Sequence, residues 1–351
     1  MRPLREAGRG RRQLREVVLE MSRRAAADRT TGGQLLTVVG AINWDVSIFV
    51  DRFPGVGEEV PALSVEEYHG GKGANVAVAA ARLLGKGRVA LVGALGDDDV
   101  AEEQLADLRR EGVLTSGLVK APRTSSGRAF VIVENGGRKT IHTLFGANDE
   151  IAPEHIEKAA VAKVIDSSSI VVVMDAPTSV GLAAARRAKG RGARIVYSPC
   201  VRAKESEAGV GDLLNLADYL VVDRTELRSL MPGAPEPRAL AQLASAHRHL
   251  TVVETRGSEG CRLALGGRIL NVPAVDLAVL GKRPVNSTGC GDAFLGAFCS
   301  FILEGAETEE AANAANLAGA LKAARRETRG SPGRSELDAA SEALKESRRR
   351  P

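Results

Sequence analysis

A short glycine-rich segment that leads into an apolar helix most restricts what this chain can form. It reads Asn286-Ser-Thr-Gly-Cys-Gly-Asp292, and small and apolar residues follow as far as Phe298. Gly289 and Gly291 allow a tight turn with positive φ angles. The backbone amides of such a turn can point together at the helix N-terminus, which creates a site for a phosphate. Asp292 would lie there as a carboxylate able to accept a proton from a hydroxyl.

A second glycine-rich stretch favours this interpretation over a plain turn whose aspartate only begins a helix. It reads His69-Gly-Gly-Lys-Gly-Ala-Asn75 and opens a predicted helix that ends at Leu84. The glycines around Lys72 let a ligand approach the backbone, and Asn75 offers both a donor and an acceptor. The sequence has neither the spacing of a Walker A loop nor a dinucleotide fingerprint after the first strand. Taken alone, this stretch could still be a flexible surface turn.

The segment before that stretch predicts a buried strand and a small β appendage. Residues 35–42 are almost continuously apolar, as in a strand buried on both faces. Asn43 and Asp45 follow, and because alternate residues of an extended backbone share a face, both can bind one ligand. Segments 46–68 and 124–146 are strand-like with no helix inside them, so we expect them to form a separate small sheet.

After Asn148 the pattern alternates between strands and helices, which predicts an α/β fold with a doubly wound, mostly parallel sheet. Ligands bind such sheets in the crevice outside the carboxyl ends of the strands. Polar residues follow several of the apolar strands at this edge: Asp175, Ser198, Asp223 and Thr255. Asp223 and Glu226 are three residues apart at a helix start, which fits either a capping box or a ligand site.

Composition and charge exclude several classes of protein. A chain of 351 residues with 44% hydrophobic residues suits one large α/β domain, or one domain with a small appendage. The net charge of +4 is small and comes largely from arginine-rich ends, which argues against a nucleic-acid-binding surface. No apolar run approaches the roughly 20 residues of a membrane span. The cysteines lack metal-ligand spacing and fit reduced thiols, so we expect a cytoplasmic protein.

The two ends of the chain differ from its middle. Residues 1–34 are basic and predicted to be a disordered extension, with Met21 as a candidate start. A transit peptide is the alternative, and the acidic residues of this segment count against it: Glu6, Glu16, Glu20 and Asp28. We expect residues 341–351 to be a frayed tail.

With both glycine-rich stretches in place, the chain resembles the ribokinase-like (PfkB) family of sugar and nucleoside kinases. Segments 69–84 and 285–298 look like the two signatures of that family, in the expected order. Within the family the likeness is greatest to ribokinases, through Asn43-Trp-Asp45, the segment 53–58 and Gly146-Ala-Asn148. The resemblance implies a kinase domain over residues 35–340, in which the small β appendage is a lid over the sugar.

The resemblance also implies roles for individual residues. The sugar hydroxyls would be held by Asn43, Asp45, Gly71, Lys72, Asn75 and Asp175. Asp292 would be the catalytic base, beside an anion hole formed by Gly289, Cys290 and Gly291. Residues at the nucleotide would be Asp223, Thr255, Gly257 and Asn316, the last beside the adenine. Glu226 would organise Mg²⁺ through water, and Asn286 stands where ribokinases bind a monovalent cation.

Some positions depart from the family pattern. Asn286 replaces the usual aspartate of the second signature, which puts activation by K⁺ in doubt. Asp223 replaces the asparagine of an Asn-x-x-Glu motif and adds charge near the phosphates. Asp175 matches a glutamate and is one methylene shorter, which could admit a different sugar. Trp44 is also unusual and could pack under the lid or offer a face to a ring.

The expected reaction is transfer of the γ-phosphoryl group of ATP to a primary hydroxyl of a sugar, with D-ribose giving ribose 5-phosphate. Fructose, 2-keto-3-deoxygluconate and nucleosides are alternative acceptors, and a non-catalytic sugar- or nucleotide-binding protein is a second class. A dehydrogenase is disfavoured because the dinucleotide fingerprint is missing. The expected ligands are ATP and Mg²⁺, with K⁺ as an optional activator. We expect a homodimer through the lid, and no nucleic-acid or membrane partner.

Overall fold

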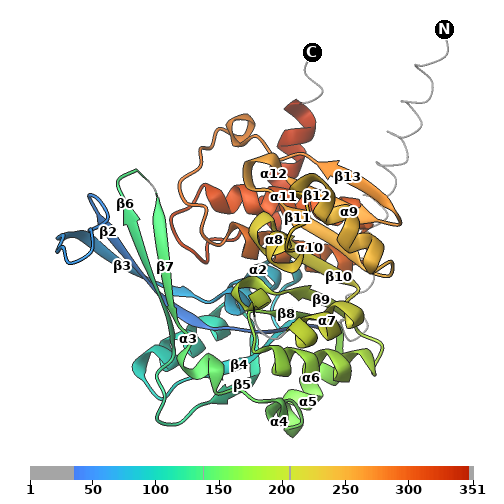
Figure 1. Ribbon diagram of the computed structural model, residues 1–351, viewed down its shortest axis with the longest axis horizontal. Helices are drawn as coiled ribbons and strands as arrows, with labels where there is room; N and C mark the ends of the chain where they lie inside the picture. Colours follow the sequence, from blue (N-terminus) through green and yellow to red (C-terminus); the bar gives the residue numbers. More distant parts are fainter. Residues whose placement is uncertain (1–34, 137, 205–206, 348–351) are drawn as a thin grey trace.

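The computed structural model describes residues 35–136, 138–204 and 207–347, so the predicted disordered extension lies outside the described residues. A nine-stranded sheet forms the centre, in the order β13-β12-β11-β10-β9-β8-β1-β4-β5 (Figure 1). Its strands are β1 (Leu35–Gly40), β4 (Val89–Leu95), β5 (Leu114–Lys120), β8 (Ser168–Met174), β9 (Arg194–Ser198), β10 (Tyr219–Asp223), β11 (Thr251–Thr255), β12 (Cys261–Leu265) and β13 (Arg268–Val272). Neighbouring strands from β11 to β5 are parallel, whereas β12 and β13 form an antiparallel edge. The predicted fold class is confirmed.

Helices cover both faces of this sheet. One face carries α2 (Lys72–Leu84), α3 (Asp99–Arg110), α10 (Cys290–Leu303), α11 (Thr308–Ala323) and α12 (Arg334–Ser347). The other carries α4 (Pro153–Ile156), α5 (Ala159–Asp166), α6 (Thr178–Lys189), α7 (Glu207–Leu216), α8 (Arg224–Leu230) and α9 (Glu236–Ala246). Alternate strand residues serve the two cores: Leu36 and Val38 of β1 join the first, and Val39 joins the second. This double burial explains why β1 and β8 are almost wholly apolar.

Short 3₁₀ turns connect some of these elements: η2 (Gly146–Asp149), η3 (Cys200–Lys204), η4 (Gly257–Glu259) and η5 (Leu277–Leu280). No helix in the described part of the chain combines the length and the apolar character needed to cross a membrane.

The small sheet has the order β3-β2-β6-β7 and projects from one side of the molecule (Figure 1). Its strands are β2 (Asn43–Val50), β3 (Ala62–Gly70), β6 (Gly127–Glu134) and β7 (Lys139–Leu144). The two segments predicted to form an appendage are thus both present, but β2 begins at Asn43, three positions before the predicted start at 46. Asn43 and Asp45 therefore belong to the small sheet itself.

One prediction about the C-terminal end was wrong. Residues 341–347 are not a frayed tail, because they continue α12 to Ser347. Leu337 of this helix is buried, and Ala340 and Leu344 pack against the same core. The spacing of these apolar residues gives the helix a buried stripe, which holds it on the domain. Residues 348–351 lie outside the described residues.

Candidate active site

A cavity of about 350 Å³ lies between the inner face of the small sheet and the carboxyl ends of the large sheet's strands. Most of the predicted site residues line it: Asn43, Asp45, Gly71, Lys72, Asn75, Asp175, Asp223, Glu226, Thr255, Gly289, Gly291 and Asp292. The small sheet adds Ala129, Val131, Lys139, Ile141 and Thr143. The remaining predicted residues lie outside the lining: Gly257, Asn286, Cys290 and Asn316.

Asn43 is held in a fixed orientation on β2. Its Oδ1 accepts a hydrogen bond from Asn148 Nδ2 at 2.9 Å, and Asn148 Oδ1 accepts from the amide of Ile42 at 2.8 Å. Asn148 is 2% exposed, so this arrangement does not depend on solvent. A buried, satisfied amide of this kind positions its neighbour before any ligand arrives. The sequence likeness at 146–148 pointed to Asn148 without giving it a role.

Asp45 faces the same cavity from the next inward position of β2. It is 7% exposed, and burial raises the pKa of its carboxyl to about 7. The Arg329 guanidinium opposes this rise in pKa, and the carboxylate of Asp292 adds to it. Asp45 can therefore meet a ligand hydroxyl as an acceptor or, when protonated, as a donor.

The start of α2 brings two more predicted residues against β2. Gly71 is the N-cap, with a φ of 86°, and a β-carbon there would lie 2.3 Å from the backbone nitrogen of Asn43. Only glycine permits this approach, which carries Lys72 and Asn75 into the cavity wall. Burial opposes the charged form of Lys72, but the acidic groups around it, Cys200 and then Asp175, raise its pKa above the usual value. Lys72 is thus a fixed positive charge in an acidic cavity.

Asp175 follows β8 in a strained conformation. Its φ is 53°, unusual for a residue with a side chain, and it is 4% exposed. Lys72 Nζ lies 3.7 Å from its Oδ2, while its buried Oδ1 has no hydrogen-bond partner among the described residues. An unsatisfied buried oxygen costs free energy unless a ligand completes it. A ligand hydroxyl in the cavity would supply that hydrogen bond.

Asp292 lies in the first turn of α10 and is 8% exposed. Asn75 Nδ2 donates to its Oδ2 at 2.8 Å, which joins α10 to α2. Burial raises the pKa of Asp292, while the hydrogen bond from Asn75 and the charge of Lys72 lower it. A carboxylate whose pKa is raised toward the working pH is a better proton acceptor than an ordinary surface aspartate.

The turn before Asp292 presents its backbone to the cavity. Gly289 is the N-cap of α10 with a φ of 83°, and a β-carbon there would lie 2.2 Å from the carbonyl oxygen of Thr328. Gly291 lies in the first turn of α10, where amides have no intrahelical acceptor and can bind an anion. Lys139 Nζ of β7 donates to Thr288 Oγ1 at 2.8 Å, so a strand of the small sheet touches this turn.

The structure turns Cys290 away from the predicted anion hole. Its amide donates to the carbonyl of Ser287 at 3.3 Å, and its Sγ donates to the carbonyl of Asn286 at 3.8 Å. Burial raises the pKa of this thiol, which favours the protonated form. Cys290 therefore fits a small residue that closes the turn from behind.

Asp223 and Glu226 form a capping box and also line the cavity, so both interpretations of their spacing fit the structure. Asp223 Oδ1 accepts from the amides of Thr225 and Glu226, and Glu226 Oε2 accepts from the amide of Asp223, so a capping box is present. Both side chains also line the cavity. Burial, reinforced by the Asp223 carboxylate, raises the pKa of Glu226 to about 7.

This acidic pair fits a hydrated Mg²⁺. Among the described residues, no group of three or more histidine, cysteine or carboxylate side chains could hold a metal alone. Mg²⁺ usually keeps several waters and binds one or two carboxylates together with substrate phosphates. A cation beside Glu226 would also stabilise the ionised carboxylate that burial disfavours.

Three other predicted residues are engaged elsewhere or lie apart from the cavity. Asn316 Nδ2 donates to the carbonyls of Val272 and Pro273, at 3.2 and 3.1 Å, and so ties α11 to the segment after β13. Gly257 opens η4 with a φ of 58°. Asn286 donates to the carbonyl of Arg326 at 2.7 Å. Their predicted ligand contacts stay predictions.

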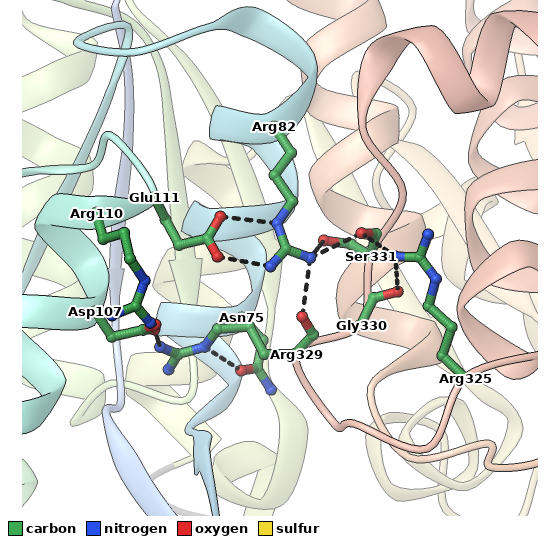
Figure 2. A network of polar contacts seen from close by, with 9 residues as sticks. All are labelled: Asn75, Arg82, Asp107, Arg110, Glu111, Arg325, Arg329, Gly330 and Ser331. Atoms are coloured by element: carbon green, nitrogen blue, oxygen red, sulfur yellow. Dashed lines mark hydrogen bonds and ion pairs between the residues drawn. The ribbon is translucent and has the colours of Figure 1, made fainter.

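Arg329 is a buried residue at this site that sequence reasoning missed. It is 8% exposed, and its Nε donates to Asn75 Oδ1 at 3.1 Å (Figure 2). Its Nη2 donates to the carbonyl of Gly70 at 2.7 Å, and it pairs with Asp107. These partners lie more than two hundred positions away in the chain, so no local motif could have revealed them.

A buried carboxylate next to an anion-binding turn, facing polar side chains across a cavity, suits the transfer of a phosphoryl group to a hydroxyl. The class so defined is a phosphotransferase with an alcohol group as acceptor. The pattern of the pfkB family carbohydrate kinases matches residues 34–333, and the chain belongs to this family of sugar kinases.

Comparisons with characterised proteins agree with this family. The chain is 29% identical over 287 residues to the ribokinase of Bacillus subtilis, which covers 82% of this chain and 92% of the relative. It is 28% identical over 281 residues to the deoxyribokinase of Salmonella typhi, covering 79% and 88%. The structure of Arabidopsis thaliana ribokinase complexed with ribose and ATP superimposes with a TM-score of 0.76 at 25% identity, covering 88% of this chain and 98% of that one.

Proposed function

We propose that this protein is an ATP-dependent kinase that phosphorylates the primary hydroxyl of D-ribose to give ribose 5-phosphate. The observation that carries the proposal is the position of Asp292, which lies in one cavity wall with the glycine turn and shares the cavity with Asn43, Asp45 and Asp175. Polar side chains that can bind sugar hydroxyls and backbone amides that can bind a phosphate thus lie on either side of Asp292. Relatives with ribokinase and deoxyribokinase activities support a pentose acceptor.

The cavity favours a sugar over a nucleoside. None of the described residues that line it is aromatic, so a base would find no ring to stack on. Trp44 lies on the opposite face of β2 from Asn43 and Asp45, where its Nε1 donates to Glu67 Oε2 at 2.6 Å. Its ring meets the His69 ring edge-on at 5.1 Å. The structure thus supports neither of the roles suggested for Trp44 from sequence.

The charge of the cavity favours a neutral acceptor. The cavity lining contains five carboxyl groups, Asp45, Asp175, Asp223, Glu226 and Asp292, but only two ammonium groups among the described residues, Lys72 and Lys139. A sugar acid such as 2-keto-3-deoxygluconate, or a sugar already phosphorylated, would bring a further negative charge among them. We therefore rank ribose and related neutral sugars above these alternatives.

The proposed mechanism relies on positioning and charge. Asp292 accepts the proton of the attacking hydroxyl, and the amides of the glycine turn stabilise the charge that develops on the phosphoryl oxygens. Lys139 adds a positive charge from β7, close to the turn. The small sheet covers one side of the cavity and so reduces the access of water to a bound phosphate, which protects ATP from hydrolysis. Mg²⁺ bound through Asp223 and Glu226 would neutralise charge on the phosphates.

We further infer a homodimer formed through the small sheet. Its face away from the cavity carries apolar side chains that are more than half exposed, Leu63 and Val65, together with Leu144 at 50%. Exposed apolar side chains on both edge strands of a projecting sheet suit contact with a second copy of the same chain. Light scattering should give the mass of two chains, and Val65→Lys should reduce it to one; a monomeric wild type would contradict the inference.

The deciding experiment is a coupled ADP-release assay with MgATP and a panel of acceptors. The panel contains ribose, deoxyribose, fructose, 2-keto-3-deoxygluconate, adenosine, cytidine and inosine. We expect saturable turnover with the highest kcat/KM on ribose, and product analysis should place the phosphate on the primary hydroxyl. Preference for a nucleoside would overturn the choice of acceptor, and absence of turnover with every acceptor would overturn the proposed function.

A further inference from the structure

A lysine lies fully buried beneath the glycine turn, outside the mechanism described so far. Lys322 in the last turn of α11 is 0% exposed and is among the largest fully buried side chains. Burying an ammonium is costly unless it is well hydrogen-bonded or paired. No carboxylate of the described residues lies within ion-pairing distance of its Nζ. Its charge must therefore be compensated by something other than a salt bridge.

Backbone carbonyls compensate the charge of the buried ammonium instead. Nζ of Lys322 donates to the carbonyl of Asn286 at 3.0 Å and reaches that of Arg325 at 3.5 Å. Asn286 opens the glycine turn, and its side-chain Oδ1 accepts from the amide of Thr288 at 2.9 Å. The carbonyl of the turn is thus held on the protein side by the ammonium. The amides of Thr288 and Cys290 are bonded within the turn, which leaves those of Gly289 and Gly291 to face the cavity.

The ammonium is also close enough to affect the reacting centre. A β-carbon on Gly289 would lie 3.4 Å from Cε of Lys322, so the side chain passes directly behind the turn. Lys322 and Asp292 interact electrostatically, and the charge of Lys322 favours ionised Asp292. Burial lowers the pKa of Lys322, and the nearby groups Cys290, Glu327 and Asp292 act in the opposite direction.

The same geometry bears on the expected monovalent cation. Asn286 was the residue expected to bind it, but its side-chain amide is committed to the carbonyl of Arg326 and the amide of Thr288. Its backbone carbonyl already accepts from Lys322. The residues present therefore do not fit a K⁺ ion, because an ammonium of this chain occupies the place next to the carbonyl.

We propose that Lys322 is a positioning residue whose tethered ammonium holds the glycine turn with its amides toward the transferred phosphoryl group, in place of a bound monovalent cation. The proposal rests on the kinase function proposed above. It predicts that kcat of the wild-type enzyme is the same in potassium, sodium and choline chloride. It also predicts that removing the ammonium lowers kcat far more than it raises KM for either substrate, because the turn acts on charge that develops in the transition state.

The test compares Lys322→Met, which keeps the length of the side chain without its charge, with Lys345→Met on the exposed face of α12 as matched control. We expect Lys322→Met to lose on the order of 10²-fold in kcat, as when a donor to a developing oxyanion is removed, and Lys345→Met to keep full activity. Circular dichroism and thermal unfolding verify that both variants fold. A folded Lys322→Met with wild-type kcat would overturn the proposal.

Chemical rescue separates a role of the charge from a purely structural one. Lys322→Ala leaves space beside the two carbonyls, and we expect ammonium or methylammonium, or K⁺, to restore turnover in a saturable way, whereas choline is too large to do so. A loss that none of these ions restores would make the role structural and overturn the proposal. If Lys322→Ala does not fold, the comparison of Lys322→Met with Lys345→Met alone tests the proposal.

A binding experiment keeps this outcome distinct from the proposed function. Calorimetry with MgADP and aluminium fluoride, an analogue of the transferred phosphoryl group, requires no sugar turnover. We expect Lys322→Met to bind the analogue more weakly than wild type and to bind MgADP alone equally well. If the wild type turns over no sugar but still binds the analogue more tightly than Lys322→Met does, the result would contradict the proposed acceptor and leave the role of Lys322 standing. Equal binding of the analogue by both proteins would contradict the role of Lys322.

Discussion

The amide of Asn75 donates from Nδ2 to Oδ2 of Asp292 at 2.8 Å, which fixes the proposed base from a different helix. The other end of the same amide accepts from Arg329 Nε at 3.1 Å (Figure 2). Because Arg329 can only donate, the amide of Asn75 has one permitted orientation, with its nitrogen toward Asp292. The position of the base therefore depends on a residue that never touches the cavity.

Replacing Asn75 should change the pH dependence of catalysis. The hydrogen bond from Asn75 lowers the pKa of Asp292, so Asn75→Ala should raise this pKa further. Since the base acts only when ionised, the acidic limb of the kcat/KM profile should move to higher pH. We also expect kcat to fall on the order of 10²-fold through lost positioning. Asn313→Ala, at an exposed asparagine of α11, is the control; an unmoved acidic limb in Asn75→Ala would contradict the role of this hydrogen bond.

Replacing the base itself should separate chemistry from binding. Asp292→Asn keeps the size of the side chain and its contact with Asn75 but cannot accept a proton. We expect kcat to fall by about 10²–10⁴-fold, the usual contribution of general base catalysis, while KM for MgATP and for the sugar stays close to wild type. Steady-state kinetics with both substrates varied measures this. A variant with near wild-type kcat would rule out Asp292 as the base.

Asp45 should make the folded protein less stable as the pH rises. Its pKa in the folded state is about 7, above the ordinary value of 3.8, so the folded state binds the proton more tightly than the unfolded state. The stability that this proton contributes is present at low pH and is lost as the pH rises through about 7. Asp45→Asn mimics the protonated form, so its advantage over wild type should grow by about 2–3 kcal/mol between pH 5 and pH 8.

Urea unfolding of both proteins at the two pH values measures this difference. The exposed Asp212 serves as the control position, since Asp212→Asn should show no such trend. The same Asp45→Asn variant should have a raised KM for the sugar, because a carboxylate in the cavity wall is replaced by an amide. A free energy of unfolding that differs from wild type equally at both pH values would show that the carboxyl is ionised throughout.

The sequence was sufficient wherever the deciding interactions are local. The apolar run 35–42 and the alternation after 148 depend on periodicity, and they led to the correct fold class. The two glycine-rich stretches depend on backbone conformations that only glycine adopts readily, at Gly71 and Gly289. These features predicted which residues meet in one cavity.

Other features depend on contacts between distant parts of the chain. Arg329 and Lys322 have no recognisable motif, because their partners at Asn75 and Asn286 come from other elements. The orientation of Cys290 depends on the residue at which α10 begins and on how the helix is rotated about its axis, and neither can be predicted from the sequence. Residues 341–347 were expected to fray because they lie near the end of the chain, whereas packing of one apolar stripe keeps them helical.

Two arginines that pair with the same carboxylate should differ sharply in their effect on stability. Arg329 and Arg110 both contact Asp107 (Figure 2), but the side chain of Arg329 is 6% exposed and that of Arg110 is 67% exposed. Removing the buried partner leaves Oδ2 of Asp107 and the carbonyl of Gly70 without this donor, so Arg329→Met should lower the free energy of unfolding by about 3–5 kcal/mol. Arg110→Met removes a solvent-screened pair and should cost about 1 kcal/mol or less.

Kinetics of the same pair of variants tests whether Arg329 also serves the site. Arg329→Met frees the amide of Asn75 to rotate, so kcat should fall and the acidic limb of kcat/KM should move to higher pH, as in Asn75→Ala. Arg110→Met should retain the wild-type profile, since Arg110 makes no contact with Asn75 among the described residues. If Arg329→Met is destabilised but has the wild-type pH profile, Arg329 contributes to folding alone and Asn75 holds Asp292 without its help.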